Sequence, residues 1–261
     1  MRWPRRLGAL LADEARQYYV VEEGLGGRRT DLDHPDPAKP SRNGWTYFPP
    51  CLASHQPDIA IIMLGTNDAQ ICHQRPAEAI VTALARYVTC CHESDVTPLL
   101  VAPLIPDSTG LFNDAIVPRS AWHFDDTAVA TLTALPEKIR TYAAKHGVAF
   151  FDANTYAEAG VDGLHWTAAG HERFARAIAQ MIREIASNTQ TSVSLMSSIS
   201  PGPSFVGIVG IISLIVCLYP PQDYFHKYII ISSTLAIACV MCHSHIKIPR
   251  AIQTADKKQF W

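Results

Sequence analysis

The sequence predicts an α/β fold built on a parallel, doubly wound sheet. Two observations support this prediction. Short apolar runs with turn residues on both sides recur along residues 1–187, and such runs are typical of strands buried on both faces. Amphipathic segments of helical period separate these runs, so that strands alternate with helices, as a parallel sheet requires. In such sheets the reactive groups lie at the carboxyl ends of the strands.

The predicted elements alternate in order along the chain. Pro76 suits the first turn of a helix, where its missing N–H costs nothing, and Thr167 is expected to cap the last helix. Pro136 is expected to bend or split a long helix, which Gly147 then ends in a left-handed conformation. The strands are predicted at 19–22, 58–64, 98–102 and 148–152, and the helices at 7–18, 76–91, 125–146 and 167–186.

A change of composition near residue 190 divides the chain. Alanine and arginine are frequent before it, whereas isoleucine, serine and lysine are frequent after it. The polar run 187–192 and the turn Pro201-Gly202-Pro203 are typical of a linker. We therefore expect a domain at 1–187, a linker at 188–203 and a hydrophobic tail at 204–261.

The tail contains two uncharged apolar runs, 205–218 and 228–242. Each is shorter than the roughly 17–25 residues of a spanning helix, but flanking aromatic residues could extend both runs. One interpretation is a membrane hairpin through 204–242 that tethers the domain. The other is a tail added by a frameshift or a fusion.

One short pattern in the tail formally matches a haem-attachment site. Cys239-Val240-Met241-Cys242-His243 has the CxxCH spacing. No haem-binding domain surrounds it, and it lacks a paired set of zinc ligands. No metal or cofactor is therefore predicted.

Charge and cysteine content exclude other classes of protein. A net charge of −2 offers no electrostatic attraction for nucleic acid, and no GxxxxGK[ST] phosphate loop occurs. Seven cysteines without regular spacing argue against a disulfide framework and indicate a reducing compartment. The basic start is followed by an amphipathic stretch rather than an apolar core. We therefore predict no secretory signal and expect a cytoplasmic domain.

A polar turn, Gly65-Thr66-Asn67-Asp68, follows directly on the most apolar strand. The amide of Asn67 can donate a hydrogen bond to a developing oxyanion, and Gly65 lets the main chain turn sharply. The alternative is an ordinary turn, because glycine, asparagine and aspartate all favour turns.

A second polar motif, Asp162-Gly163-Leu164-His165, precedes the last helix. A carboxylate three residues ahead of a histidine can reach the imidazole, fix its tautomer and stabilise the imidazolium. The alternative is a polar loop that only leads into the helix. The two motifs together indicate a reactive site more strongly than either does alone.

A glycine-rich segment, Gly24-Leu25-Gly26-Gly27-Arg28, follows the first predicted strand. Its spacing does not match the GxGxxG dinucleotide fingerprint, and no helix start follows it. Its glycines can bring a main-chain N–H to the same oxyanion position.

In this order, the motifs resemble those of the SGNH hydrolases, also called the GDSL esterase/lipase family. The matching blocks are Gly24-Leu25-x-x-Arg28, Gly65-Thr66-Asn67-Asp68 and Asp162-Gly163-x-His165. The stretch Tyr47-x-Pro49-Pro50-Cys51-Leu52-Ala53-Ser54-His55 resembles the family's bacterial arylesterase/acyltransferase branch. The resemblance covers residues 2–187.

The resemblance implies a flavodoxin-like three-layer α/β/α sandwich. It also implies acyl transfer from a small-molecule ester to water or another alcohol through an acyl-serine, without a cofactor. His165 would be the general base and Asp162 the carboxylate that orients it. The side chain of Asn67 and the main-chain N–H of Gly27 would donate to the oxyanion.

The family's nucleophile lies in a Gly-Asp-Ser-Leu motif, after a first central strand and ahead of the position that matches Arg2-Trp3-Pro4. No Gly-Asp-Ser occurs among the 261 residues. We expect a domain truncated at its N-terminus, without its first central strand and inactive as written. The alternative is a noncatalytic binding module or gene remnant with the same fold. Four serines do not follow a strand at a tight turn and are not expected to replace the nucleophile: Ser41, Ser54, Ser108 and Ser120.

Overall fold

The computed structural model describes residues 1–12, 18–113 and 124–198, with side chains up to residue 188. The chain divides into one compact unit at Met1–Asn188 and a second at Thr189–Trp261. Both apolar runs of the predicted tail, the CxxCH pattern and Ser120 lie outside the described residues. Within the described part of the chain, no helix combines the length and apolar character needed to cross a membrane.

Three parallel strands form the sheet of the first unit, in the order β1-β2-β3. They are β1 (Ile59–Ile62), β2 (Thr97–Ala102) and β3 (Ala149–Asp152). Each falls within or beside a predicted apolar run, so the parallel α/β fold is confirmed. Because the strands run in one direction, their carboxyl ends meet at one edge of the sheet, where the loops that follow them lie together.

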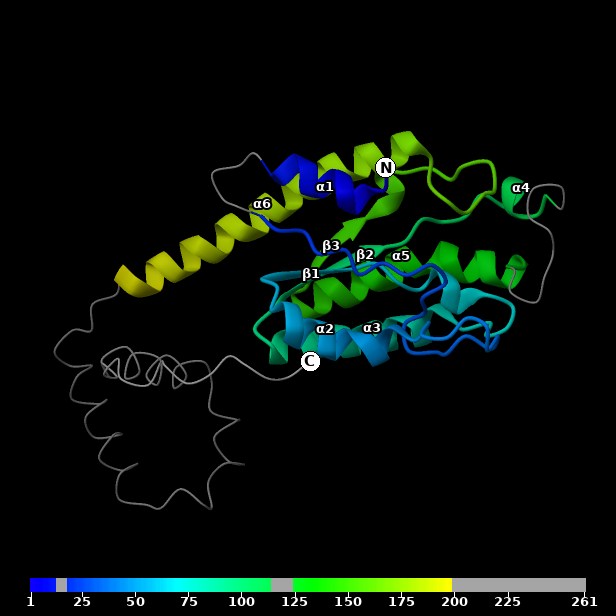
Figure 1. The fold of residues 1–261 in the computed structure, drawn as a ribbon, viewed down its shortest axis with the longest axis horizontal. Coiled ribbons are helices and arrows are strands. Elements are labelled where there is room, and N and C mark those ends of the chain that lie inside the picture. Colours follow the sequence, from blue (N-terminus) through cyan, green and yellow to red (C-terminus); the bar gives the residue numbers. More distant parts are fainter. Residues whose placement is uncertain (13–17, 114–123, 199–261) are drawn as a thin grey trace, which may run out of the picture. The chain divides into compact units, whose positions relative to one another are not determined.

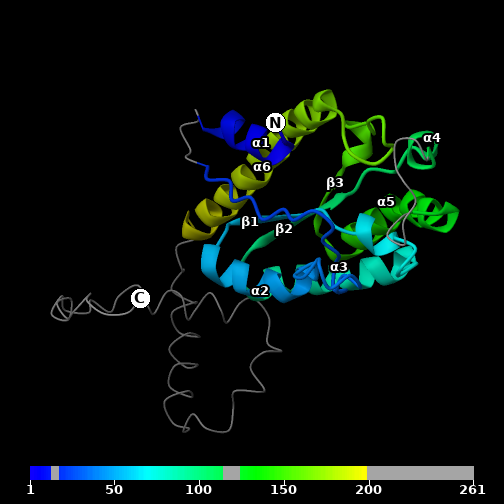
Figure 2. The same cartoon turned by 45° about the vertical axis from the view of Figure 1, so that its right-hand side comes forward.

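Helices cover the sheet on both faces (Figures 1 and 2). One layer contains α1 (Trp3–Leu11) and α6 (Ala168–Ser198). The other contains α2 (Gly44–His55), α3 (Ala77–Glu93) and α5 (Asp126–His146). The central strand β2 alternates between the two layers, as strand geometry requires. Leu99 and Val101 belong to the core beneath α1 and α6, whereas Leu100 and Ala102 belong to the core beneath the other helices.

Several predicted helix ends are confirmed. The hydroxyl of Thr167 accepts a hydrogen bond from the main-chain N–H of Gly170 at 2.9 Å. Gly147 ends α5 with φ +65° and donates to the carbonyl of Ala143. Pro136 does not split α5, which is one helix from Asp126 to His146. Pro136 and the neighbouring Leu132, Leu135 and Ile139 are buried, so packing on the sheet offsets the hydrogen bond that proline cannot make.

The strand predicted at 19–22 is not present. These residues form no ladder with any described strand, and Tyr19 is 92% exposed. A strand forms only where its N–H and C=O groups find a partner, which the apolar pattern of this segment does not guarantee. Among the described residues, β1 is therefore an edge strand.

Helix α2 was not predicted, and it contains Pro49 and Pro50. The helix begins by docking on a distant segment. The N–H of Gly44 donates to the carbonyl of Arg29 at 2.9 Å, and that of Trp45 donates to the carbonyl of Thr30 at 2.8 Å. These bonds satisfy donors that the first turn of a helix leaves unpaired.

The predicted linker also differs from the structure over part of its length. Residues 188–198 continue α6, which ends at Ser198 rather than near residue 186. Serine, asparagine and threonine are only mildly unfavourable in helices, so a long helix already started can extend through them.

Candidate functional site

The turn after β1 places Asn67 at the carboxyl edge of the sheet. Gly65 has φ +119°, and a Cβ there would lie 2.9 Å from side-chain carbons of Ile80 and Leu135. Only glycine fits this conformation and this space. The chain then forms a short 3-10 helix, η1 (Thr66–Ala69). From it the amide nitrogen of Asn67 donates to the carbonyl of Arg28 at 3.1 Å, which joins η1 to the glycine-rich segment.

A buried arginine, Arg29, holds the glycine-rich segment in place. Arg29 is fully buried, and its guanidinium donates to the carbonyl of Gly27 at 3.2 Å and to the side chain of Gln70. Gly27 has φ +78°. Its main-chain N–H has no hydrogen-bond partner among the described residues. The structure thus places Gly27 and Asn67, two residues expected in the site, on segments that contact each other.

Asp68 ties these segments together from inside the protein. Its side chain is fully buried and accepts a hydrogen bond from the N–H of Thr30 at 3.0 Å and from the guanidinium of Arg75 at 3.1 Å. The hydroxyl of Thr30 donates to the same carboxylate. Arg75 also pairs with Asp31. Each polar group in this cluster therefore has a partner, as burial demands.

The second motif forms a compact turn ahead of α6. Asp162 Oδ2 lies 2.6 Å from His165 Nδ1. Its other oxygen, Oδ1, accepts from the N–H of Leu164 at 3.0 Å and from that of His165 at 2.9 Å. Burial alone would raise the pKa of the Asp162 carboxyl, but these hydrogen bonds outweigh it and hold the pKa below its ordinary value. Asp162 is therefore ionised at neutral pH.

A close contact between two loops fixes the position of this turn. The N–H of Asp107 donates to the carbonyl of Gly163 at 2.8 Å. Gly163 has φ +69°, and a Cβ there would overlap the Asp107 carbonyl. Asp107 caps the short helix α4 (Ser108–Leu111), which follows β2 and was not predicted. The absence of a side chain at Gly163 thus lets the Asp162–His165 turn seat directly on the loop after β2.

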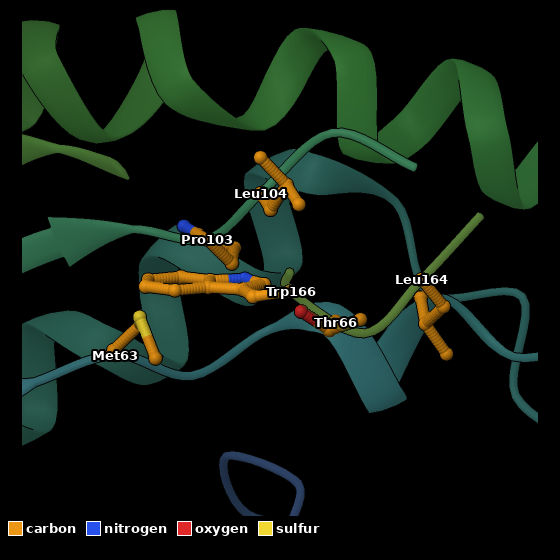
Figure 3. A pocket seen from close by; sticks show the side chains of 6 residues that line it. All are labelled: Met63, Thr66, Pro103, Leu104, Leu164 and Trp166. Carbon is orange, nitrogen blue, oxygen red and sulfur yellow. The ribbon is translucent and has the colours of Figure 1, made fainter. Parts of the chain in front are cut away.

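A cavity of ≈70 Å³ lies between the two halves of the site. Figure 3 shows the indole of Trp166 lying between Pro103 and Met63. The lining comes from the segments after β1 and β2 and from the turn before α6: Met63, Thr66, Pro103, Leu104, Leu164 and Trp166. Thr66 adjoins Asn67 in sequence, whereas Leu164 and Trp166 flank His165. All the segments that carry expected site residues, except the glycine-rich one, therefore border this cavity.

The histidine faces solvent. The side chain of His165 is 83% exposed, and among the described residues Asp162 is its only side-chain partner. Because Nδ1 faces the carboxylate, Nε2 is the nitrogen that remains available to a reacting group.

No described serine pairs with His165. Ser41 and Ser54 are exposed, and Ser54 lies on α2. Ser108 is also exposed and begins α4, but none of the three hydroxyls is hydrogen-bonded to the imidazole. Among the described residues, Asp162 is therefore the side-chain partner of the imidazole, and none of these serines is.

Arg29, Thr30 and Arg75 were missed as supports of the site. The sequence offered one clue, which is the position of these residues beside the predicted motifs. Arg29 and Thr30 directly follow the glycine-rich segment, and a buried acid, Asp68, lies in the other motif. The hydrogen bonds of Asp68 with Thr30 and Arg75 join separate segments of the chain, so they are visible only in the fold.

Comparison with known proteins adds a family match. A model of the GDSL-like Lipase/Acylhydrolase family matches residues 1–173. No curated protein matches the chain.

Several solved structures are similar over most of their length. An inhibitor-bound aryl esterase from M. smegmatis is 31% identical, with a TM-score of 0.61, over 70% of this chain and 85% of that one. Est24, a carbohydrate acetylesterase from Sinorhizobium meliloti, is also 31% identical, with a TM-score of 0.57 and the same coverage. A structure from Agrobacterium tumefaciens, provisionally named an arylesterase, is 35% identical, with a TM-score of 0.58, over 70% of this chain and 86% of that one.

Proposed function

Because the chain belongs to the GDSL-like lipase/acylhydrolase family, we propose that the sheet edge with Asn67 and His165 is part of an ester-hydrolysing site. The 2.6 Å contact between Asp162 Oδ2 and His165 Nδ1 carries this proposal. An ionised carboxylate on one ring nitrogen leaves the other free to accept a proton from an attacking hydroxyl. The carboxylate also stabilises the imidazolium that this proton transfer creates.

Two groups, the side chain of Asn67 and the main-chain N–H of Gly27, serve as oxyanion donors in this proposal. Asn67 uses one amide N–H on the carbonyl of Arg28, which orients the amide and leaves its second N–H for a ligand. The main-chain N–H of Gly27 is without a described partner. Donors fixed in this way stabilise negative charge without reorganising during the reaction.

The reaction follows from these roles. A serine hydroxyl attacks the ester carbonyl and passes its proton to His165 Nε2, while Asn67 and Gly27 bind the oxyanion. His165 returns the proton to the leaving alcohol, which gives an acyl-serine. A water molecule or a second alcohol then attacks the acyl-serine and gives the acid or a new ester. No cofactor enters these steps.

The size of the cavity supports a short acyl group as substrate. Its volume of ≈70 Å³ is small beside the roughly 300–1,000 Å³ of pockets that enclose drug-sized ligands. The lining is mixed: Met63, Leu104 and Leu164 offer apolar contacts to the methyl end of an acetyl group, beside polar surface. A carbohydrate acetylesterase among the similar structures supports the same substrate class.

We further propose that no serine within these 261 residues is the nucleophile. The Gly-Asp-Ser motif is absent from the sequence, and no described hydroxyl pairs with His165. The same observation supports a second candidate function, a noncatalytic module that binds an ester or carboxylate at this edge.

Hydrolysis of p-nitrophenyl acetate by the purified 261-residue chain tests the proposal about the nucleophile. We expect the same background rate for the wild type, His165→Ala and the exposed control His92→Ala. Turnover that His165→Ala abolishes and His92→Ala preserves would show that a serine within the chain acts.

A further inference from the structure

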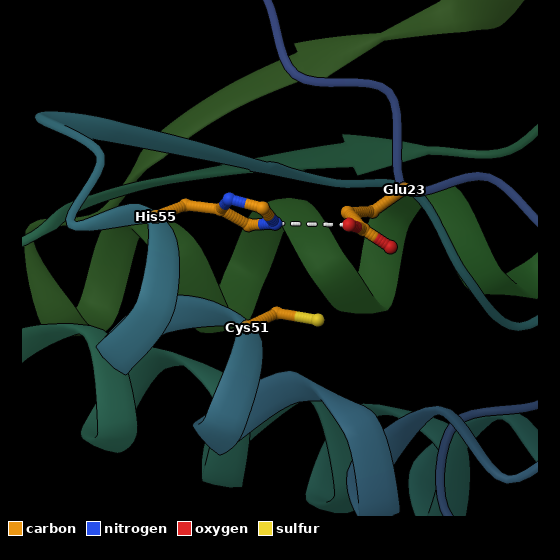
Figure 4. A group of neighbouring side chains, drawn as sticks. All are labelled: Glu23, Cys51 and His55. Carbon is orange, nitrogen blue, oxygen red and sulfur yellow. Dashed lines mark hydrogen bonds and ion pairs between the residues drawn. The ribbon is translucent and has the colours of Figure 1, made fainter. Parts of the chain in front are cut away.

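Three side chains outside the ester site converge at the end of α2. Glu23 lies on the segment before the glycine-rich turn, while Cys51 and His55 lie on α2. Their ligand atoms, one oxygen, one sulfur and one nitrogen, all lie within 4.8 Å of one another. Figure 4 shows the three side chains turned toward a common space between the helix and the opposite segment. Residues four apart on a helix share a face, so α2 itself aligns the cysteine and the histidine.

We propose that Glu23, Cys51 and His55 form a binding site for Zn²⁺. Thiolate sulfur, imidazole nitrogen and carboxylate oxygen are the ligands that zinc takes in proteins, usually four in tetrahedral geometry. Three protein ligands leave the fourth position to water or to an external ligand. One thiolate and one carboxylate balance the two positive charges of the ion, so the site is neutral once filled.

The surroundings fit such a site. The His55 and Glu23 side chains are 37% and 50% exposed, so an ion can enter from solvent. His55 Nε2 already lies 3.0 Å from Glu23 Oε1, which orients both toward the shared space. Zinc binds the thiolate form of cysteine, so binding displaces the thiol proton to solvent.

The site has a structural consequence. Glu23 lies on the segment that leads to Gly27, whereas Cys51 and His55 lie on a helix that docks on Arg29 and Thr30. An ion bound by Glu23, Cys51 and His55 would link this segment to α2. It would therefore stabilise the folded state and hold the glycine-rich turn in place.

Titration of the purified chain with Co²⁺, a spectroscopic substitute for zinc, tests the proposal. We expect one ion per chain and a near-ultraviolet thiolate-to-cobalt absorption band that Zn²⁺ abolishes by competition. Cys51→Ser removes the band, whereas the control Cys90→Ser, a half-buried thiol on α3, leaves it unchanged. His55→Asn and Glu23→Gln weaken binding by more than the roughly 10–100-fold typical of an outer-shell partner. A band that survives Cys51→Ser, or no stoichiometric binding, would overturn the proposal.

A second measurement needs no variant. Zn²⁺ is added to the wild-type chain before alkylation with iodoacetamide, and each cysteine-containing peptide is quantified by mass spectrometry. We expect zinc to slow the alkylation of Cys51 at least about tenfold, because a bound thiolate is no longer free to react. The rate at Cys90 should not change. Equal rates at Cys51 with and without zinc would contradict the site, whatever the stability of the variants.

Discussion

Asp162 holds both the ring of His165 and the main chain beside it. One carboxylate oxygen lies 2.6 Å from His165 Nδ1, and the other accepts the N–H groups of Leu164 and His165. The same side chain therefore shapes the turn and leaves Nε2 as the ring nitrogen that is open to a reacting group. This double role makes the tautomer of His165 a direct measure of the arrangement.

Asp162→Asn should change that tautomer. An amide at this position can donate to Nδ1 instead of accepting from it, which favours the form with the proton on Nε2. Nitrogen chemical shifts of the labelled imidazole at mildly alkaline pH report the two forms. The wild type should carry its proton on Nδ1, and the variant should shift toward Nε2. An unchanged tautomer in Asp162→Asn, with Asp58→Asn as a surface control, would contradict the assigned contact.

Gly163→Ala should destabilise the domain more than Gly147→Ala. Both residues have positive φ, but a Cβ at Gly147 meets no atom within 4 Å, whereas one at Gly163 overlaps the Asp107 carbonyl. The backbone strain alone costs about 1–2 kcal/mol. The added overlap should cost a further 1–3 kcal/mol, roughly the range seen for overpacking. Urea unfolding of both variants gives the two free energies, and equal losses would show that the contact with Asp107 is not tight.

Asp68→Ala should lower the free energy of unfolding by about 3–5 kcal/mol, the cost of breaking a buried charge pair. The substitution leaves the N–H and hydroxyl of Thr30 without their acceptor and removes one partner of Arg75. The exposed Asp58, whose side chain makes no described bond, is the matched control. Asp58→Ala should change stability by less than about 0.5 kcal/mol. Similar losses in the two variants, measured by urea unfolding, would mean that the Asp68 cluster does not stabilise the fold.

Asp31 should make the stability of the domain depend on acid pH. Burial opposes its ionisation, but hydrogen bonds from Arg75, Arg86 and Thr30 outweigh burial and lower its pKa below 3.8. A pKa that is lower in the folded state than in the unfolded state stabilises the fold at pH values above the unfolded-state pKa. This stabilisation is lost as the pH falls through the folded-state pKa. Asp31→Asn should therefore be less stable than the wild type at about pH 7, and the difference should shrink toward about pH 3.

The control for this pH dependence is Asp58→Asn, which should match the wild type at both pH values. Urea unfolding at each pH gives the comparison. A difference between Asp31→Asn and the wild type that stays constant from neutral to acid pH would argue against the ion pairs of Asp31.

The sheet could be predicted from the sequence because its strands are continuous apolar runs. The runs at 58–64, 98–102 and 148–152 each contain or overlap a strand of the structure. The segment 19–22 has a similar composition, yet its pairing depends on a neighbour that a local pattern does not reveal. Helix α2 was missed for a related reason, since the carbonyls of Arg29 and Thr30 satisfy its first N–H groups from a distance.

The candidate site, like the fold, could be predicted from the sequence only in part. The Asp162–His165 contact spans three residues and could be predicted from spacing alone. Asn67 was a candidate from its position after a strand, whereas Gly27 was singled out through the family resemblance. The contact of Asn67 with the carbonyl of Arg28, beside Gly27, is a tertiary feature. The group Glu23, Cys51 and His55 was not predicted, because the spacing of Cys51 and His55 has meaning only once α2 is known to be a helix.

The central claim is that Asn67, Gly27, Asp162 and His165 are parts of one ester-hydrolysing site. Its most direct test is a chain extended ahead of Met1 by a strand-forming segment that ends in Gly-Asp-Ser-Leu, assayed with p-nitrophenyl acetate. We predict turnover that disappears when the added serine is replaced by alanine and in His165→Ala. Asn67→Ala should reduce kcat by about 10²–10³, whereas His92→Ala should keep full activity. A folded, extended chain that shows no turnover, or turnover that persists in His165→Ala, would contradict the claim.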